Sequence, residues 1–405
     1  MPQTIQPPGP TPAGPSSVRQ FTPAQLSALL GRTQWPELHF QQSHSGVVQS
    51  VIIPKNFTLT RPLYSIHIMW RGRIAVTVAN YTATNAESLA NIINRIRLFG
   101  THRLFNSLRP IDVTGSWAFA WARLFQQRGN SMYINGVRQA EMNVPLTSAW
   151  AATTAGSPYD IELHYEIPLV PMLGPHSRLA VLPFMANPDD WGDTLQLQLD
   201  LGDKNSIGDS TGATVAFTAF GSGGGSPTVT IYGNYGILGP AAKALQDRMA
   251  TLVRASGNVI SSSVSAVGNR IRLTQLQRTR TTNVYWKTGV RQVSALTTGS
   301  PFATLIDTIV DQPQILVDNK PVRNTFDAQS VKEYGGFMFN TVNPGGYSGL
   351  SFIDGQNPLT YFRGDKTGGA AFELVANILT AVANQDAEFC QEQVYRIDDP
   401  SQPEL

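Results

Sequence analysis

Apolar and polar residues alternate in many short runs along the chain, which is the pattern of half-buried β-strands. The alternation is clearest over 194–201, where every second residue is a leucine. It recurs over 160–170, where Ile161, Leu163, Tyr165 and Ile167 would share one face. We predict further strands at 47–53, 65–78, 92–99, 178–184, 214–220, 228–235, 284–296, 302–310, 315–317, 337–342, 350–353, 360–362, 373–382 and 388–397.

A few stretches carry apolar residues at helical spacing instead. The clearest has large side chains at three- and four-residue steps: Trp117, Trp121, Leu124 and Phe125. Another follows Pro240, which suits the first position of a helix. We predict helices at 114–125, 241–255 and 327–334.

The N-terminal residues follow a different pattern. Prolines are frequent up to about residue 20, so this stretch is expected to be an arm without helix or ladder. A short amphipathic helix is predicted next, with Thr22 as its N-cap and Gly31 as its stop. It would present an apolar face for docking, made of Phe21, Leu26, Leu29 and Leu30. Packing of this helix on its own domain explains the pattern equally well.

Many short strands separated by Gly, Pro and Asn turns predict an all-β protein, since strand and helix do not alternate regularly. The sequence order of strands, one short helix and more strands occurs in both halves, which favours two tandem eight-stranded jelly rolls with short inserted helices. We predict these parts: an arm and N-terminal helix over 1–37, a first roll over 38–238, a partly helical linker over 239–280 and a second roll over 281–405. Gly221–Pro227 is expected to be a flexible, hairpin-like connection.

Charged residues make up only 14% of the 405 residues, against about 25% in an average soluble domain. Such a chain is expected to have much surface facing other protein, as in an assembly subunit, although secreted lectins are also charge-poor. The net charge of +2 demands neither nucleic acid nor an anionic membrane as a partner. A single cysteine, Cys390, excludes an internal disulfide and is expected to be a buried, inert thiol. We expect neither a signal peptide nor a membrane-spanning segment, and a reducing cytoplasm as the place of synthesis.

Candidate chemistry is sparse. The six histidines form no metal-binding motif, and His67 and His164 are expected to be hydrogen-bonded structural residues of strands. Asp189, Asp190 and Asp193 could bind calcium or act as a glycosidase pair, but a polar turn before a strand is the favoured interpretation. We therefore predict no catalytic residue, no metal and no cofactor.

The most basic stretch is 269–291, which also contains Tyr285 and Trp286. Basic and aromatic residues together could contact nucleic acid. A contact between subunits or a solvated linker is favoured, and no sequence-specific nucleic-acid binding is expected.

Several motifs, in this order, resemble the double jelly-roll major capsid proteins of tectivirus-like phages, in the structural lineage of adenovirus hexon. The resemblance is carried by the segment from Phe21 to Leu29, by Thr114–Trp117 opening an aromatic helix, by Ile161–Leu169 with Tyr165-x-x-Pro168-Leu169, and by 388–395 as a last strand. The Ala- and Ser-rich stretch 240–270 departs from the pattern, so the topology of the linker is open. Overall length agrees.

The resemblance implies a virion protein rather than an enzyme. Such subunits form homotrimers with a pseudo-hexagonal outline, which tile an icosahedral shell around an internal membrane and genome. Penton and minor capsid proteins would be partners, and the N-terminal arm would face them or the membrane. The chain would be found in the virion capsid, and in the host cytoplasm during assembly.

Two other function classes fit the sequence less well. A glycan-binding β-sandwich or receptor-binding virion protein would use exposed aromatic residues such as Trp35, Trp150, Trp191 and Tyr347. A glycoside hydrolase would use the three aspartates of 189–193.

Overall fold

The structure is a computed structural model. In the first half of the chain it describes residues 35–46, 49–53, 56–57, 63–76, 88–102, 106–118, 131–138, 158–168, 191, 193–203, 206, 215–221 and 224–235. In the second half it describes residues 252–256, 260–263, 270–273, 280–291, 302–306, 310–317, 320–323, 346–351, 362–363, 372–378 and 385–396. The N-terminal arm and the predicted docking residues Phe21, Leu26, Leu29 and Leu30 lie outside these ranges.

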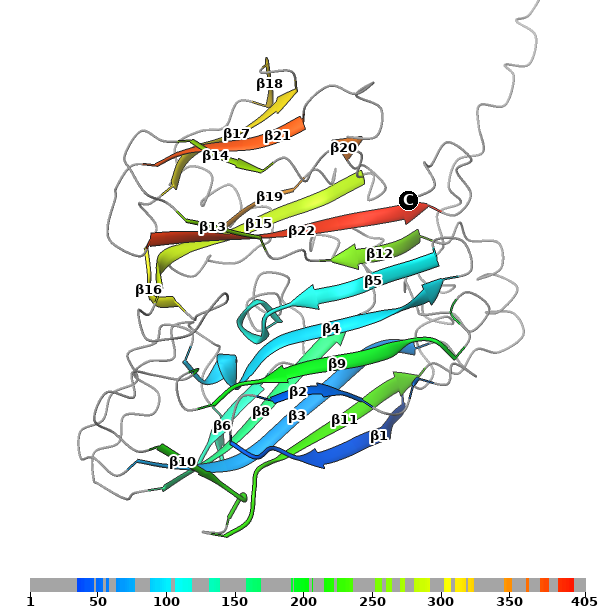
Figure 1. Cartoon of the computed structure of the whole chain (residues 1–405), viewed down its shortest axis with the longest axis vertical. Coiled ribbons are helices and arrows are strands. Elements are labelled where there is room, and N and C mark those ends of the chain that lie inside the picture. The colour runs from blue at the N-terminus through cyan, green and yellow to red at the C-terminus, as the bar shows by residue number, and fades with distance from the viewer. Residues whose placement is uncertain are drawn as a thin grey trace, which may run out of the picture.

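Two antiparallel sheets form the first roll (Figure 1). The first sheet has the order β1 (Trp35–Ser43), β11 (Thr228–Tyr235), β3 (Leu63–Val76), β8 (Pro158–Pro168), β6 (Ser131–Ile134) and β7 (Val137–Arg138), with β10 (Val215–Thr218) also on β3. The second has the order β5 (Asn106–Val113), β4 (Ile93–His102), β9 (Gln196–Leu201) and β2 (Gln49–Ile52). A short 3₁₀ helix, η1 (Ser88–Ile92), leads into β4.

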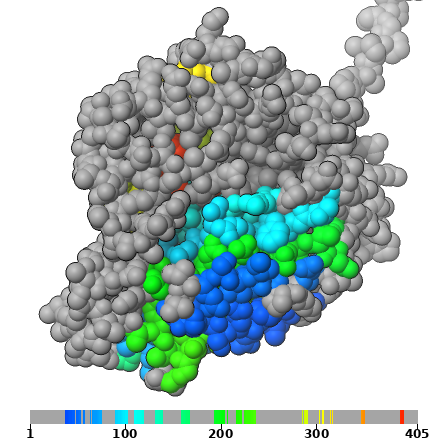
Figure 2. All heavy atoms as spheres, viewed as in Figure 1, coloured from blue at the N-terminus to red at the C-terminus, as the bar shows by residue number. Residues whose placement is uncertain are grey.

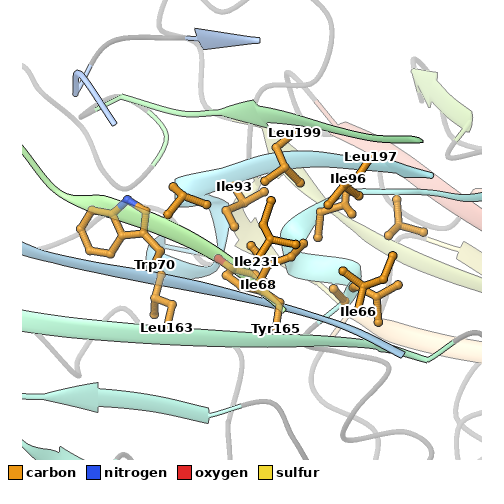
Figure 3. Close-up of a cluster of buried hydrophobic side chains, with 14 of the residues drawn as sticks. Ile66, Ile68, Trp70, Ile93, Ile96, Leu163, Tyr165, Leu197, Leu199 and Ile231 are labelled. Carbon is orange, nitrogen blue, oxygen red and sulfur yellow. The ribbon is translucent and has the colours of Figure 1, made fainter. Parts of the chain in front are cut away.

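The core of the first roll lies between these sheets because each strand places every second side chain inward. On β3 the buried residues Ile66, Ile68 and Trp70 alternate with less buried ones, and on β9 Leu197 and Leu199 do the same. Figure 3 shows side chains of both sheets meeting in this layer. Burial of aliphatic and aromatic surface is therefore what holds the sandwich together.

The second roll is built from the remaining strands. One sheet contains β12 (Leu252–Ser256), β13 (Ile260–Ser263), β22 (Gln385–Arg396), β15 (Arg280–Arg291), β16 (Phe302–Leu305), β19 (Tyr347–Ser351) and β20 (Phe362–Arg363). The other has the order β14 (Arg270–Leu273), β21 (Phe372–Ile378), β17 (Val310–Val317) and β18 (Lys320–Arg323).

Both rolls have the same eight strand positions. In chain order they are β1, β2, β3, β4, β5, β8, β9 and β11 in the first roll, and β12/β13, β14, β15, β17, β18, β19/β20, β21 and β22 in the second. In each roll, one sheet has the order of positions 1-8-3-6. The other sheet has the order 2-7-4-5. This is an eight-stranded jelly roll twice over, as the sequence predicted.

The two rolls share a sheet. Strands β5 and β12 run parallel and pair at Ile111 and Ser256, which joins four strands of the first roll to seven of the second in one 11-stranded sheet. Figure 1 shows the second roll continuing the first along the long axis of the molecule, with β5 and β12 side by side. Because an exposed sheet edge invites association, each roll covers an edge of the other here.

Predictions for the middle of the chain need correction. Residues 252–255, predicted as the end of a helix, belong to β12 and pair with β22. Strands β13 and β14 also lie inside 239–280, the predicted linker, and fill the first two positions of the second roll together with β12. Tertiary pairing decides the conformation of these short segments, which have little pattern of their own. The other boundaries between the parts stay predictions.

Of the predicted helices, the one at 114–125 is described over 114–118 and is helical over 115–118. Predicted helix 327–334 and strands 178–184 and 337–342 lie outside the described residues. The Gly221–Pro227 connection joins β10 to β11, with positive φ at Gly221 (70°) and Gly225 (82°). Across the part of the chain that the structure describes, no helix has the length and hydropathy needed to cross a membrane.

Candidate functional site: the seam between the two rolls

A short helical turn from the first roll lies against strands of the second roll, and we call this contact the seam. The turn is Gly115–Ala118, directly after β5, and its partners are side chains on β15, β19 and β22. Thr114 caps the turn: its hydroxyl accepts a hydrogen bond from the backbone N–H of Trp117 at 3.3 Å, and its carbonyl accepts one from Ala118 at 3.1 Å. The Thr-Gly-Ser-Trp sequence therefore starts the helix as predicted.

Gly115 allows the turn to lie this close to the first roll. A Cβ at this position would meet the backbone carbonyl oxygens of Ile93 and Ala90 and come within 3.2 Å of the Tyr165 ring. The Tyr165 hydroxyl is itself fixed, since it donates a hydrogen bond to the carbonyl of Ala90 at 3.0 Å. The carbonyl groups of Ile93 and Ala90 are backbone atoms, so they cannot move aside as the end of a flexible side chain could.

Changing Gly115 to Ala is expected to lower the free energy of unfolding by roughly 1–3 kcal/mol, because the backbone must shift to admit the methyl group. Urea unfolding followed by circular dichroism measures the change. Gly224→Ala is the matched control, because a Cβ there would meet nothing within 4 Å. Equal effects of the two substitutions would contradict the close packing at Gly115.

A buried polar cluster occupies the seam. Lys287 on β15 and Glu388 on β22 are direct cross-strand neighbours, with Nζ and Oε1 3.0 Å apart. The turn from the other roll adds two hydrogen bonds: Lys287 Nζ donates to Ser116 Oγ at 2.9 Å, and Trp117 Nε1 donates to Glu388 Oε1 at 2.6 Å. The side chains of Lys287 and Glu388 are only 1% and 4% exposed.

Aromatic rings surround the ammonium group. Lys287 Nζ lies 5.4 Å from the centre of the Trp117 ring and 5.3 Å from that of Phe302. Tyr347, opposite Lys287 on β19, meets Trp117 edge to face at 5.6 Å. A desolvated cation over aromatic faces is a favourable contact, and the rings exclude water from the ion pair.

The seam fixes how the two rolls sit relative to each other. Tyr347 and Cys390 of the second roll belong to the same hydrophobic cluster as Trp117 and Tyr165 of the first. Burying two charges costs desolvation energy that only well-placed partners offset, so the rolls fit together in the one arrangement that pairs them. The seam therefore joins the two rolls through specific polar and aromatic contacts.

A charged network flanks the seam on the outer face of β5. Asp112 is 3% exposed and receives two hydrogen bonds from Arg95, at 2.6 and 2.9 Å. Arg97 and Arg109 lie 3.7 and 3.6 Å from the same carboxylate, and Arg97 also pairs with Asp200 at 2.8 Å. These pairs tie β4, β5 and β9 together beside the strand that meets β12.

A second polar cluster lies on the outer face of the first sheet, on β3 and β8. His67 Nδ1 and His164 Nε2 share a hydrogen bond of 2.8 Å, and His67 Nε2 lies 3.1 Å from Ser65 Oγ. Burial lowers the pKa of His67 to about 4, with the neighbouring His164 adding to the shift, and it also lowers the pKa of His164. Both rings are therefore neutral at neutral pH, and they are hydrogen-bonded residues of strands, as predicted.

Glu166 belongs to the same cluster, with a carboxylate oxygen 4.0 Å from His67 Nε2. Burial raises its pKa to about 7, and a hydrogen bond with Ser65 opposes this shift. Because burial favours the neutral forms of both groups, their contact is not a salt bridge. Among the described residues, no three His, Cys, Asp or Glu side chains are arranged to hold a metal ion.

Glu166→Gln is expected to stabilise the protein at pH 8 and to have little effect at pH 4. The native pKa lies above the value of 4.5 for an exposed glutamate, so the cost of ionising Glu166 grows from pH 4.5 to about 7 and is constant above. A pKa difference of this size corresponds to about 3 kcal/mol. Unfolding curves at both pH values test this, with Glu162→Gln on the same strand as control. A gain independent of pH would contradict the assignment.

The aspartates and aromatic residues that the sequence offered as candidate sites do not form a site among the described residues. Asp189 and Asp190 lie outside the described residues, whereas Asp193 is exposed and its carbonyl accepts a hydrogen bond from Asn56 at 2.7 Å. Trp191 and Tyr347, expected to be exposed glycan-binding aromatics, are 5% and 0% exposed, so this expectation is wrong for both. Nothing is described of Trp150 or of the Trp35 side chain.

The basic stretch also needs correction. Lys287 and Trp286 are 1% and 5% exposed, so at these two positions neither the favoured solvated linker or subunit contact nor the alternative nucleic-acid surface is found. Cys390 is buried, as predicted. Sequence reasoning missed Ser116, Lys287 and Glu388 as a group, because no local pattern connects a helix start to two strands far along the chain.

Comparison with solved structures finds this fold in viral major capsid proteins. The major capsid protein of Sulfolobus turreted icosahedral virus matches with a TM-score of 0.55 at 12% identity, over 91% of this chain and 98% of that chain. VP54 of the virus PBCV-1 matches with 0.53 at 11% identity, over 90% and 94%. The faustovirus major capsid protein matches with 0.50 at 9% identity, over 90% of each chain.

In sequence, neither a family profile nor a curated protein matches the chain. At identities near 10% the structural likeness concerns the fold, and it extends over both rolls and nearly the whole of each chain compared. The predicted double jelly-roll fold is confirmed.

Proposed function

We propose that this chain is the major subunit of an icosahedral viral capsid, with a structural and not an enzymatic role. The observation that carries the proposal is the seam, where two jelly rolls share one sheet and one core around a buried ion pair. Two rolls held rigidly together suit a subunit of a closed shell. The same fold extends over 98% and 90% of two viral major capsid proteins.

Self-association follows from this role. The chain is poor in charge, as suits subunits whose side walls meet other protein. The finer proposal is a homotrimer with a pseudo-hexagonal outline, in which six rolls stand side by side and neighbouring trimers tile the shell. The chain would then reside in the virion capsid and be present in the host cytoplasm during assembly.

Further partners are proposed from the resemblance of the sequence to tectivirus-like capsid proteins. These are penton and minor capsid proteins and an internal viral membrane. The N-terminal segment with Phe21, Leu26, Leu29 and Leu30 would face one of them from the inside of the shell.

Size-exclusion chromatography with light scattering tests the proposal directly. The expected result is a particle of three chains, and negative-stain images should show a hexagonal outline. A stable monomer of 44.1 kDa over a wide concentration range would overturn the proposal.

A further inference from the structure

The six histidines of this chain are distributed unevenly between the two rolls. None of them follows residue 176 in the sequence, whereas the described strands of the second roll begin with β12 at Leu252. Histidine is the side chain whose unperturbed pKa, about 6.5, lies in mildly acidic solution. A response to mild acid that depends on histidine is therefore confined to the first roll.

His44, directly after β1, is held in its neutral form by its contacts. The side chain is 0% exposed, and its Nδ1 accepts a hydrogen bond from Trp70 Nε1 at 3.1 Å. A charged imidazole carries a proton on both nitrogens, so a charged His44 would lose this bond and turn an N–H toward the indole N–H. The rings that meet His44 edge to face, Trp70 and Phe217, are uncharged.

His102, at the end of β4, is equally buried. It is 0% exposed, its ring meets Trp191 with the ring centres 5.1 Å apart, and it lies opposite Asn106 on β5. Placing a charge on a ring that is removed from water costs free energy. His44 and His102 therefore both favour the folded first roll only as neutral rings.

His67 and His164, on the outer face of the first sheet, have room for one proton between them. His67 Nδ1 and His164 Nε2 are 2.8 Å apart, and the two rings are stacked with their centres 5.0 Å apart. If both rings were charged, two N–H groups would point at each other across this distance. The lowered pKa of each ring agrees with this geometry. Folding thus disfavours protons that the unfolded chain would accept.

Other titratable and charged groups share this face with the histidine pair. They are Glu166 and Glu162 on β8, Arg71 on β3, Tyr232 on β11 and Tyr133 on β6. Arg71 and Glu162 form an ion pair at 2.8 Å, and tyrosine gains no proton in acid. Glu166 acts against the histidines, because its pKa of about 7 lets the folded state take up a proton first. This one carboxyl offsets about one histidine and leaves the other three.

We propose that the first roll is an acid-sensitive element, which loosens in mildly acidic solution while the second roll keeps its structure. A histidine with a lowered native pKa contributes stability that is fully present above the unfolded value of about 6.5. For His67 this contribution is lost as the pH falls toward about 4. Figure 2 shows blue, cyan and green atoms of the first roll over a broad part of the near surface, so on this side the second roll does not shield it from solvent. The inference goes beyond the proposed function and concerns the single chain as much as any assembly.

Hydrogen exchange measured by mass spectrometry at pH 7 and pH 5 tests the proposal on the full chain. Peptides from β3 and β11 are compared with peptides from β15 and β22, which hold the third and eighth positions of the two rolls. After correction for the pH dependence of intrinsic exchange, we expect protection of β3 and β11 to fall about tenfold or more between pH 7 and pH 5. Protection of β15 and β22 should change less than about threefold. Equal losses in both rolls would overturn the inference, because they would place the acid response in the seam pair Lys287–Glu388 or in the whole chain. An unchanged first roll would overturn it too.

Two variants with opposite expected effects identify the groups responsible. His67→Gln combined with His164→Gln keeps side chains that donate and accept hydrogen bonds but cannot be charged, so the acid-dependent loss in β3 should shrink to about threefold or less. Glu166→Gln removes the opposing carboxyl and should enlarge the loss about tenfold. Glu162→Gln on the same strand is the control and should leave the loss unchanged. A smaller or equal loss in Glu166→Gln would contradict the proposal, and this variant decides even if the double histidine variant does not fold.

Discussion

Replacing Lys287 by methionine is expected to lower the free energy of unfolding by about 3–5 kcal/mol, because it leaves the carboxylate of Glu388 buried without its cation. Methionine fills a similar volume among the rings of Trp117 and Phe302, so the loss reports the charge and not a cavity. Urea unfolding followed by circular dichroism measures it. We also expect the fraction of assembled subunits to fall, since the two rolls lose the contact that fixes their arrangement.

Two further variants show whether the pair itself is responsible. Lys287→Met combined with Glu388→Gln should recover most of the loss, because no charge remains buried and the glutamine oxygen still accepts the Trp117 hydrogen bond. The exposed pair Arg71–Glu162 is the matched control: its atoms are 2.8 Å apart, but its side chains are 45% and 26% exposed. Arg71→Met should cost less than about 1 kcal/mol. A loss this small at Lys287 would refute a buried ion pair in the seam.

Replacing Trp117 by alanine is expected to cost about 3–5 kcal/mol, the range for removing a large buried aromatic side chain. The substitution opens a space between Tyr347 and Lys287 and removes the donor at 2.6 Å from Glu388. The unfolding free energy measures the cost. Limited proteolysis of the folded protein should also become faster, with cleavage between the rolls.

Trp117→Phe separates the two contributions. It keeps a buried aromatic ring, although a smaller one, and removes the indole N–H, so a loss of about 1–3 kcal/mol is expected, mainly from the weakened hydrogen bonding of Glu388. If phenylalanine were as damaging as alanine, the hydrogen bond would dominate the seam; if both were neutral, Trp117 would not join the rolls at all.

Several strands of the first roll could be predicted because one of their faces is buried and the other is not, whereas β1, β5, β6 and β7 were missed. Over 228–235 the predicted and observed strands coincide, and three of the four regular leucines of 194–201 fall on β9. In β5 only Ile111 and Val113 form an alternating apolar pair, which is too short a pattern to indicate a strand. Pro110 interrupts the run, and Asp112 is an outward charge that three arginines cover.

The second roll could be predicted less well for a different reason. Its first two positions are the short strands β12, β13 and β14, of four or five residues each, which are rich in serine and arginine. Their extended conformation comes from pairing with β22 and β21, strands that lie far along the chain. No local propensity announces such a strand.

The site itself was half predictable. The cap at Thr114 and the helix start are local, so the sequence indicates them. Lys287 instead reads as one basic residue among several, because the carboxylate and rings that bury it come from other strands. Buried charges of this kind can be recognised only once the partner strands are placed side by side.

The hydrogen bond from Trp117 to Glu388 joins residues 271 positions apart, and Glu388 lies in β22, the final described strand. Nearly the whole chain must therefore be synthesised before β22 can pack against the first roll. Until then, Ser116 and Trp117 lack their partners in the second roll. Contacts this distant in sequence form slowly. Growing chains therefore cannot complete the contact between the rolls, and in the proposed capsid only completed polypeptides could enter a shell.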